Sequence, residues 1–328
     1  MRALKQIVKT TLASPPAWRM SAAFRGAPRT FVLAYHRIGT PGEILNHTDA
    51  GAFRRQMHWL KRHCLPIAPD DLLQPADPAD PRPRVLVTFD DGYKDYYQLA
   101  YPVLHELKIP AANFISTDYA DTGRLFWWDV VDFAGHRSAK TSVTLPWAPH
   151  TRFELNDGTR LTVLRACKYV IACAPDADRD RLVAEACAMF GVDAAAIDAP
   201  RQVMTWDEIR ASMEWTFYGG HTHTHVRVSR VDPAILDREV RICRDRLRDE
   251  TGLAPTLFAY PIGDGSDDAR EILPRYGFSM AFTVHKGYVD AEVDWLNVPR
   301  FTGPASVGEL AWLAVGQGRA DRVSAGRH

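Results

Sequence analysis

Val85–Gly92, which reads VLVTFDDG, is the stretch that decides the fold of this 328-residue chain. Its first five residues are apolar or β-branched without alternation, which predicts a strand buried on both faces. Two aspartates and a glycine follow directly, and parallel sheets place their ligand sites at the carboxyl ends of strands. Because Asp90 and Asp91 would repel each other there, a cation or a shared proton is expected beside them. Taken alone, Asp-Asp-Gly is also ordinary turn chemistry.

Strand and helix patterns alternate on both sides of this stretch. The expected strands are Thr30–Tyr35, Val85–Phe89, Ala112–Ser116, Leu257–Tyr260 and Met280–Thr283. The expected helices lie near Asp49–His63, Tyr96–Leu107, Asp232–Gly252 and Asp268–Tyr276, with a further start at the capping box of Thr205 and Glu208. This alternation predicts an α/β fold with a mostly parallel sheet and outer helices, and it leaves closure into a barrel open.

The stretch from about residue 121 to residue 200 departs from this rhythm. It begins with the aromatic cluster Phe126-Trp127-Trp128 and continues into alanine-rich helical sequence from Arg160 to Phe190. We interpret it as an insertion in a main domain of residues 30–303, which is preceded by a segment of residues 1–29 and followed by a tail of residues 304–328.

Composition excludes some classes of function. Forty Lys and Arg residues balance forty Asp and Glu residues, so no nucleic-acid partner is expected. The five cysteines are scattered without a C-x-x-C pair, which favours reduced thiols. At the N-terminus, Met1–Ala13 has charges that break every apolar run, unlike a secretory signal. Reduced thiols and the lack of a signal-like apolar run together favour a cytoplasmic location. As a helix, Met1–Ala13 would be basic and amphipathic, suited either to the inner face of a membrane or to packing on its own protein, so peripheral membrane contact is left open.

A second motif strengthens the case for a site. His221-Thr222-His223-Thr224-His225 places three of the twelve histidines within five residues. On a helix or on a strand, His221 and His225 would share one face, where they would converge on one metal ion with a carboxylate as third ligand. Spacing alone leaves His223 as a further ligand candidate, and a histidine-rich solvated loop is the alternative. Two histidines, one carboxylate and an open position suit a hydrolytic metal site.

Together the two motifs resemble the polysaccharide deacetylase family, also called the NodB-homology family or carbohydrate esterase family 4. The resemblance covers roughly Phe31 to Phe301, and the segment Leu33–Arg37 (LAYHR) is similar to the start of many such domains. It implies a distorted (β/α) barrel with an inserted helical and aromatic segment.

The resemblance also implies roles for individual residues. Asp90 would be the general base, and Asp91, His221 and His225 would hold a divalent metal, with His223 in a non-ligand position. The donor set suits Zn²⁺ best, with Fe, Co and Ni as alternatives.

The third motif of the family, Arg-x-Pro-x-Gly, is altered here. Ala259–Gly263 reads AYPIG, so the loop and an oxyanion-binding N–H from Ile262 are expected, with Tyr260, Pro261 and Ile262 as substrate contacts. The motif's arginine, which steadies the catalytic aspartate, is absent. We expect Arg300 to replace it, and a surface charge after a strand is the alternative.

The fifth motif, which supplies a general acid from a histidine, is not visible. His36 ends the first expected strand on the same rim as Asp90, so we favour it as acid or substrate contact over a buried structural histidine. His285 is a weaker candidate for the same role.

In the insertion, Trp127 and Trp128 could stack on sugar rings and Asp129 could accept a sugar hydroxyl. Packing inside the insertion is the alternative.

The leading hypothesis is a metal-dependent hydrolase that removes an N-acetyl group from a carbohydrate, as a step in making a surface polysaccharide. Its substrate would be an N-acylated sugar, lipid-linked or nucleotide-linked. The alternatives are a deformylase or another non-peptide amide hydrolase, and a carbohydrate-binding protein with a decayed site. Retention of Asp90 beside the three ligand candidates argues against decay, because binding alone requires no base.

Overall fold

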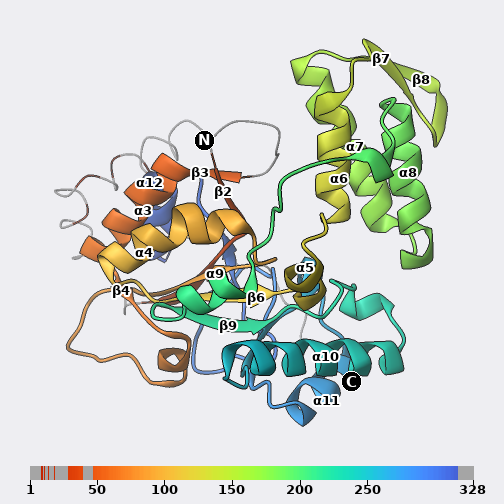
Figure 1. Cartoon of the computed structure of the whole chain (residues 1–328). Helices are drawn as coiled ribbons and strands as arrows, with labels where there is room; N and C mark the ends of the chain where they lie inside the picture. The colour runs from red at the N-terminus through yellow and green to blue at the C-terminus, as the bar shows by residue number, and fades with distance from the viewer. Residues whose placement is uncertain are drawn as a thin grey trace. The chain divides into compact units, whose positions relative to one another are not determined.

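The computed structural model of the chain describes Lys9, Thr11, Ser14, Trp18 and residues 29–39 and 47–316. Most of the predicted N-terminal segment 1–29, including its proposed membrane-facing side, and residues 317–328 lie outside the described residues. The chain divides into two compact units (Figure 1). The first comprises Met1–Thr40, Thr48–Thr122 and Val203–His328, and the second comprises Pro41–His47 and Gly123–Gln202.

The first unit is built on an eight-stranded parallel sheet. Seven strands follow the order β11-β10-β9-β6-β5-β1-β12, and β4 pairs with β5. Their bounds are β1 Thr30–Tyr35, β4 Leu65–Pro66, β5 Arg84–Phe89, β6 Ala111–Ile115, β9 Thr216–Gly220, β10 Leu257–Ala259, β11 Met280–Phe282 and β12 Phe301–Thr302. Short strands β2 (Arg37–Gly39) and β3 (His47–Asp49) follow β1 along the chain. The predicted α/β class is confirmed.

The segment before β12 closes this sheet into a barrel. Val298 forms a parallel bridge with Phe282 of β11, and three residues later Phe301 pairs with Leu33 of β1. One strand-like segment therefore joins the two edges of the sheet, but each pairing extends over only one or two residues. This short closure is what makes the (β/α) barrel distorted.

Both faces of the central strands are buried, as the unbroken apolar run in β5 predicts. Val32, Leu86 and Phe114 pack inside the barrel, whereas Leu33 and Val87 pack outward against the helices. An alternating strand would have left one of these faces exposed to water.

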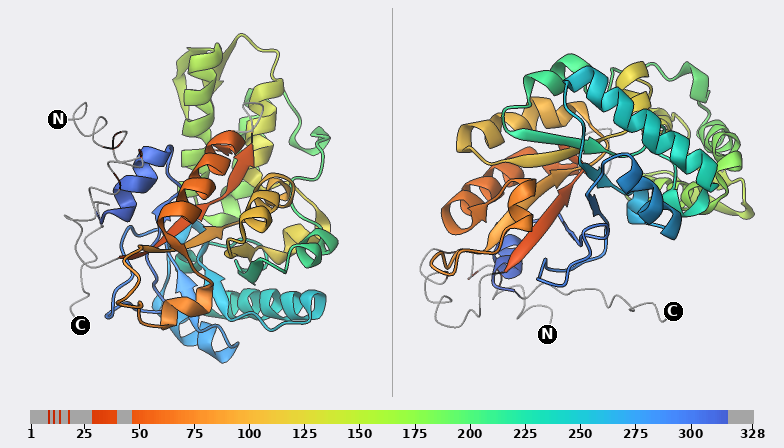
Figure 2. Two further views of the ribbon diagram at one scale, coloured as in Figure 1. Left: turned by 90° about the vertical axis from the view of Figure 1, so that its left-hand side faces the viewer. Right: turned by 90° about the horizontal axis from the view of Figure 1, so that it is seen from below.

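The helices of the first unit lie outside the strands (Figure 2). Their bounds are α3 Ala50–His63, α4 Tyr101–Leu107, α5 Thr117–Thr122, α9 Trp206–Ala211, α10 Pro233–Thr251, α11 Asp267–Arg275 and α12 Val307–Ala314. The start and end signals of α10 are confirmed: the side chain of Asp232 accepts from the N–H of Ala234, and Gly252 ends the helix at φ 75°. The segment taken for a tail begins with α12, whose Leu310 and Ala311 are fully buried in the main core.

The second unit has its own small core. Helices α6 (Trp127–Arg137), α7 (Asp157–Cys173) and α8 (Arg179–Met189) pack with a hairpin of β7 (Ser142–Leu145) and β8 (Ala148–Glu154). Figure 1 shows these elements as one group. The hairpin was not predicted from the sequence. Every residue of β8 is exposed or half-buried, so the strand shows no alternation of apolar and polar residues.

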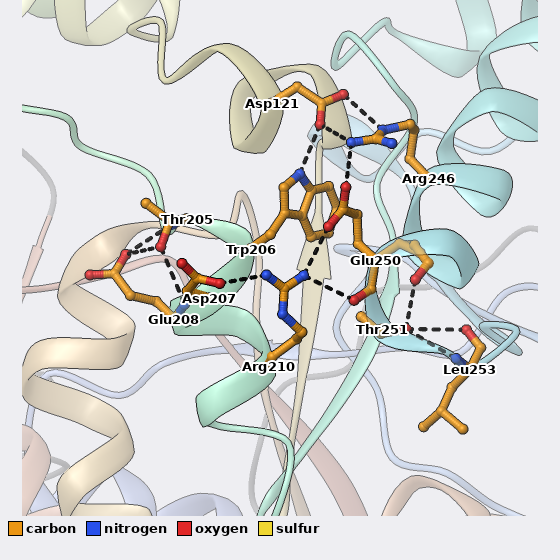
Figure 3. A network of polar contacts seen from close by, with 11 residues as sticks. Asp121, Thr205, Trp206, Asp207, Glu208, Arg210, Arg246, Glu250, Thr251 and Leu253 are labelled. Carbon is orange, nitrogen blue, oxygen red and sulfur yellow. Dashed lines mark hydrogen bonds and ion pairs between the residues drawn. The ribbon is translucent and has the colours of Figure 1, made fainter.

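A polar network holds the two chain segments that lead out of and back into the first unit (Figure 3). Asp121, near the end of α5, accepts a hydrogen bond from Trp206 Nε1 in α9 at 2.8 Å. The same carboxylate accepts two hydrogen bonds from Arg246 of α10, at 2.6 and 3.0 Å. Arg210 of α9 extends the network to Glu250 of α10 at 2.8 Å. Helix α10 therefore anchors both segments on the first unit.

Among the described helices, none combines the length and apolar character needed to cross a membrane. No disulfide joins the five cysteines.

Candidate active site

The two sequence motifs meet at the carboxyl ends of neighbouring strands. Asp90 and Asp91 follow β5, and His221 follows β9, with β6 as the single strand between them. Among the described residues, Asp91, His221 and His225 form the one group of His, Cys, Asp or Glu side chains arranged to hold a metal ion. Their ligand atoms all lie within 4.8 Å of one another, and all three side chains are buried.

Asp91 lies at the centre of this group. Its Oδ1 atom is 3.4 Å from Nε2 of His221 and 3.3 Å from Nε2 of His225. Burial would raise the pKa of Asp91, but the two facing imidazoles and the charge of His36 hold it far below its ordinary range. Asp91 is therefore an anion facing two ring nitrogens.

The donor chemistry of these atoms fits a metal ion. Nδ1 of His221 lies 2.7 Å from the carbonyl oxygen of Ala259, which only accepts, so this nitrogen carries the proton. In the neutral ring, Nε2 then directs a lone pair toward Asp91 Oδ1, a buried oxygen without a hydrogen bond to any described residue. Two facing acceptors need a positive charge between them, either a proton or a metal ion, and fixing a ligand histidine through its other nitrogen is the usual arrangement at metal sites.

Backbone strain shapes the histidine loop. Residues 221–225 form neither a helix nor a strand, which corrects our assumption that regular periodicity aligns the two imidazoles. Instead, Thr222 and His225 adopt left-handed conformations, with φ of 59° and 58°. Asp91 (φ 73°) and Ile262 (φ 62°) do the same, so four of the five described non-glycine residues with positive φ belong to the site. Such strain persists only where the surroundings hold it, and it often marks functional sites.

His223, which spacing left as a ligand candidate, faces elsewhere. Its Nδ1 is 2.9 Å from Oγ1 of Thr117 in α5, and it is not part of the metal-binding group.

Asp90 is paired on its other side with Arg300. NH1 and NH2 of Arg300 donate to Oδ1 and Oδ2 of Asp90 at 2.7 and 2.8 Å. Nε of Arg300 donates to the carbonyl of Thr283, and NH1 also donates to Thr88 Oγ1. Burial would raise the pKa of Asp90, but the charge and hydrogen bonds of Arg300 outweigh it and keep the pKa below its usual value. Asp90 is thus an oriented, ionised carboxylate beside the metal-binding group.

His36 lies at the rim, directly after β1. Its Nε2 is 3.7 Å from Asp90 Oδ2, and its side chain is 48% exposed. The alternative of a buried structural histidine is therefore wrong, and His36 is accessible to a ligand that reaches Asp90. The weaker candidate, His285, is also exposed.

The loop after β10 differs in part from its predicted role. Tyr260 is buried and donates its hydroxyl to the carbonyl of Leu296, and Pro261 is buried as well. Ile262, at 46% exposure, is the accessible member of the three predicted substrate contacts. The residue that sequence analysis missed is Ala259, whose carbonyl orients His221.

Trp127, Trp128 and Asp129 belong to the second unit. Trp128 stacks on Phe126 with 4.5 Å between ring centroids, and both tryptophans are partly exposed. Asp129 is 1% exposed, in contrast to the predicted contact with a sugar hydroxyl, because the first turn of α6 directs it inward. Sugar stacking on Trp127 and Trp128 stays a prediction.

The fold and the site define a class: a distorted (β/α) barrel with an Asp-His-His group that could hold a metal ion and an arginine-held carboxylate at the carboxyl ends of its strands. The family model for polysaccharide deacetylases matches residues 77–149 and 197–281. Over these residues the chain is similar to the polysaccharide deacetylase family, whose members are hydrolases of non-peptide carbon–nitrogen bonds. No curated protein sequence matches the chain.

Solved structures share the fold. A Streptococcus pyogenes deacetylase, PplD in complex with acetate, is 16% identical with a TM-score of 0.59, and the match covers 88% of this chain and 99% of that one. IcaB from Ammonifex degensii is 21% identical with a TM-score of 0.58, covering 89% of this chain and 98% of that one. The deacetylase domain of BpsB from Bordetella bronchiseptica is 15% identical with a TM-score of 0.52, covering 85% and 97%.

Proposed function

We propose that this protein is a metal-dependent hydrolase that removes the N-acetyl group from a carbohydrate used to build a surface polysaccharide. The observation that carries the proposal is the arrangement around Asp91: its buried Oδ1 faces Nε2 of His221 and Nε2 of His225, while the neighbouring Asp90 is held by Arg300. A binding protein would need no ionised base beside such a group. The match to the family model supports the sugar substrate.

Asp91, His221 and His225 would hold the metal, with Zn²⁺ as first candidate because two nitrogens and one carboxylate oxygen suit it, and Fe, Co or Ni as alternatives. A divalent metal there would supply Lewis-acid polarisation and make water more acidic.

Asp90 would act as the general base. Both of its oxygens are oriented by Arg300, and each retains a lone pair to accept a proton. Asp90 takes one proton from the attacking water while the water oxygen forms its bond to the acyl carbon. The role of Arg300 is to position Asp90 and keep it ionised.

The oxyanion and the leaving group each need a partner. The N–H of Ile262, set by its left-handed conformation, would donate to the acyl oxygen as negative charge develops. His36 would give a proton to the sugar nitrogen as the carbon–nitrogen bond breaks, so that an amine and a carboxylic acid are released. The proton taken up by Asp90 would then pass through solvent to His36, which restores both groups.

The experiment combines metal analysis with product analysis. The wild type, Asp90→Asn and the distant control Asp121→Asn are purified without chelators, and acetate and formate release are measured from N-acetylated and N-formylated amino sugar oligomers. We expect one bound divalent metal in all three, with acetate release abolished only in Asp90→Asn. A wild type without metal would rule out the metal-dependent mechanism, and release of formate alone would identify a deformylase.

The lipid-linked or nucleotide-linked nature of the substrate, the cytoplasmic location and the membrane contact of the N-terminal segment remain predictions. Cell fractionation with and without residues 1–12, and acetate release from lipid-linked oligosaccharide, test them directly.

A further inference from the structure

One charged residue lies on the buried face of helix α10. The other buried members of this face are Leu236, Val240, Cys243 and Leu247, and they follow the helical repeat. Glu239 interrupts this apolar stripe and is only 4% exposed. A buried carboxylate is costly unless hydrogen bonds compensate for lost water, so its contacts indicate why it is there.

Both oxygens of Glu239 contact the histidine loop at Thr224. Oε2 accepts the backbone N–H of Thr224 at 2.7 Å, and Oε1 accepts its hydroxyl at 2.9 Å. Hydrogen bonds to a carboxylate are roughly twice as strong as those between neutral groups. Thr224 directly precedes His225, so Glu239 fixes the backbone immediately before a candidate metal ligand.

The two ends of this loop are held in different ways. His221 is fixed by the sheet: its N–H donates to the carbonyl of Ile115, its carbonyl accepts from Ser116 Oγ, and its ring meets the carbonyl of Ala259. His225 lies beyond the end of the strand and has a left-handed backbone at φ 58°, a conformation that a residue with a Cβ adopts at a cost. The Glu239–Thr224 contacts lie next to this strained residue.

We propose that Glu239 is a positioning residue that holds the His221–His225 loop in the conformation in which both imidazoles face Asp91. Glu239 is not one of the three candidate metal ligands, and it acts through Thr224. The inference rests on the proposed function, because the two Glu239–Thr224 hydrogen bonds would serve to keep the candidate ligands His221 and His225 in place. Partners that orient ligands in this way are typically worth about 10- to 100-fold in metal affinity.

The test compares two substitutions on the same helix face. Glu239→Leu removes both hydrogen bonds to Thr224. Val240→Ala removes packing from the neighbouring buried position and keeps both hydrogen bonds. Zn²⁺ affinity of the metal-stripped full-length proteins is measured by competition titration, and thermal unfolding reports general stability. We expect Glu239→Leu to weaken Zn²⁺ binding about 10- to 100-fold, and Val240→Ala to lower the unfolding temperature without changing Zn²⁺ affinity.

Further variants keep the test decisive if Glu239→Leu does not fold. Glu239→Gln retains an acceptor for the Thr224 N–H, so it should lose less affinity than Thr224→Val combined with Glu239→Gln, which leaves no hydroxyl to pair. The absorption spectrum of bound Co²⁺ should change in the variants that loosen the loop, because it reports ligand geometry. Unchanged Zn²⁺ affinity and Co²⁺ spectrum in the folded double variant would overturn the role of Glu239, while the wild type still bound metal. A wild type that binds neither ion would instead overturn the proposed function, and this inference with it.

Discussion

Arg300 and Arg246 each form a two-point ion pair with an aspartate, and these two pairs differ mainly in their surroundings. Arg300 and Asp90 lie inside the barrel, with side-chain exposures of 0% and 3%. Arg246 and Asp121, whose contact is drawn in Figure 3, are exposed by 34% and 27%. The hydrogen-bond lengths are similar, 2.7 and 2.8 Å inside and 2.6 and 3.0 Å at the surface. Similar geometry therefore occurs in two very different dielectric environments.

Burial determines what each pair contributes. Inside the barrel, water cannot solvate either charge if its partner is removed, so the pair is costly to break. The two hydrogen bonds from Arg300 also fix the orientation of Asp90. At the surface, water and salt replace a lost partner at little cost, and the pair contributes mainly to the local arrangement of α5, α9 and α10. Under the proposed function the first pair serves the chemistry by orienting Asp90, whereas the second supports the chain segments around residues 122 and 203.

Removing one partner of the buried pair should have the largest effect. Arg300→Leu leaves the Asp90 carboxylate enclosed without a cation, which we expect to cost about 3–5 kcal/mol in the free energy of unfolding. Urea denaturation of the metal-stripped protein measures it. The double variant Asp90→Leu with Arg300→Leu should recover much of this loss, because the uncompensated charge is gone. A double variant less stable than Arg300→Leu would contradict this account.

A conservative change should separate charge from geometry. Arg300→Lys keeps a cation but loses the fork that contacts both oxygens of Asp90. Misplacing a catalytic group by about 1 Å is worth roughly 10²-fold in rate, so we expect kcat for deacetylation to fall by about that factor, with bound metal retained. The matched control is Arg246→Lys in the surface pair, for which kcat should not change. Equal loss of kcat in both variants would show that burial is not what distinguishes them.

The buried half of this comparison was largely accessible from the sequence. The apolar run before Asp90 predicts the strand, the strand end predicts the location of the site, and the two histidines at positions 221 and 225 predict convergence. Arg300 was predicted because the segment Ala259–Gly263 lacks the arginine that the family's third motif provides, so another segment had to supply the cation that contacts Asp90. The strand and the location of the site follow from local patterns and residue types, whereas the expectation of Arg300 rested on the resemblance to the family.

What the sequence did not predict depends on backbone conformation and on tertiary contacts. Nothing local indicates that Thr222 and His225 adopt positive φ, since threonine and histidine do so only when the fold requires it. The orientation of Tyr260 depends on the carbonyl of Leu296, 36 positions away. Glu239 left a signal, a charge on the apolar stripe of α10, but its partner Thr224 is visible only in the fold.

The surface pair should respond weakly to substitution and strongly to salt. Asp121→Asn removes the negative charge that Arg246 contacts, and exposed pairs are worth about 0.2–1 kcal/mol. The difference in unfolding free energy between this variant and the wild type should shrink in about 1 M NaCl, where the screening length falls to roughly 3 Å. Thermal or urea unfolding at low and high salt measures it. The cost of Arg300→Leu, in contrast, should persist in high salt.

Low pH should also remove the contribution of the Asp121–Arg246 pair to the free energy of unfolding, and this is the smallest of the expected effects. Burial would raise the pKa of Asp121, but hydrogen bonds from Arg246 and Trp206 hold it below its ordinary value in the folded protein. The unfolded chain therefore takes up the proton first, at about pH 3.9, so the stabilisation is present above that pH and is lost as pH falls through the lower folded-state pKa. Urea unfolding of the wild type and Asp121→Asn between about pH 3 and pH 7 should show a constant difference near neutrality that narrows below about pH 4. A difference that stays constant down to the lowest pH would mean that the charge of the Asp121 carboxylate is not its source. The packing and the hydrogen bond between Asp121 and Trp206 would then account for it.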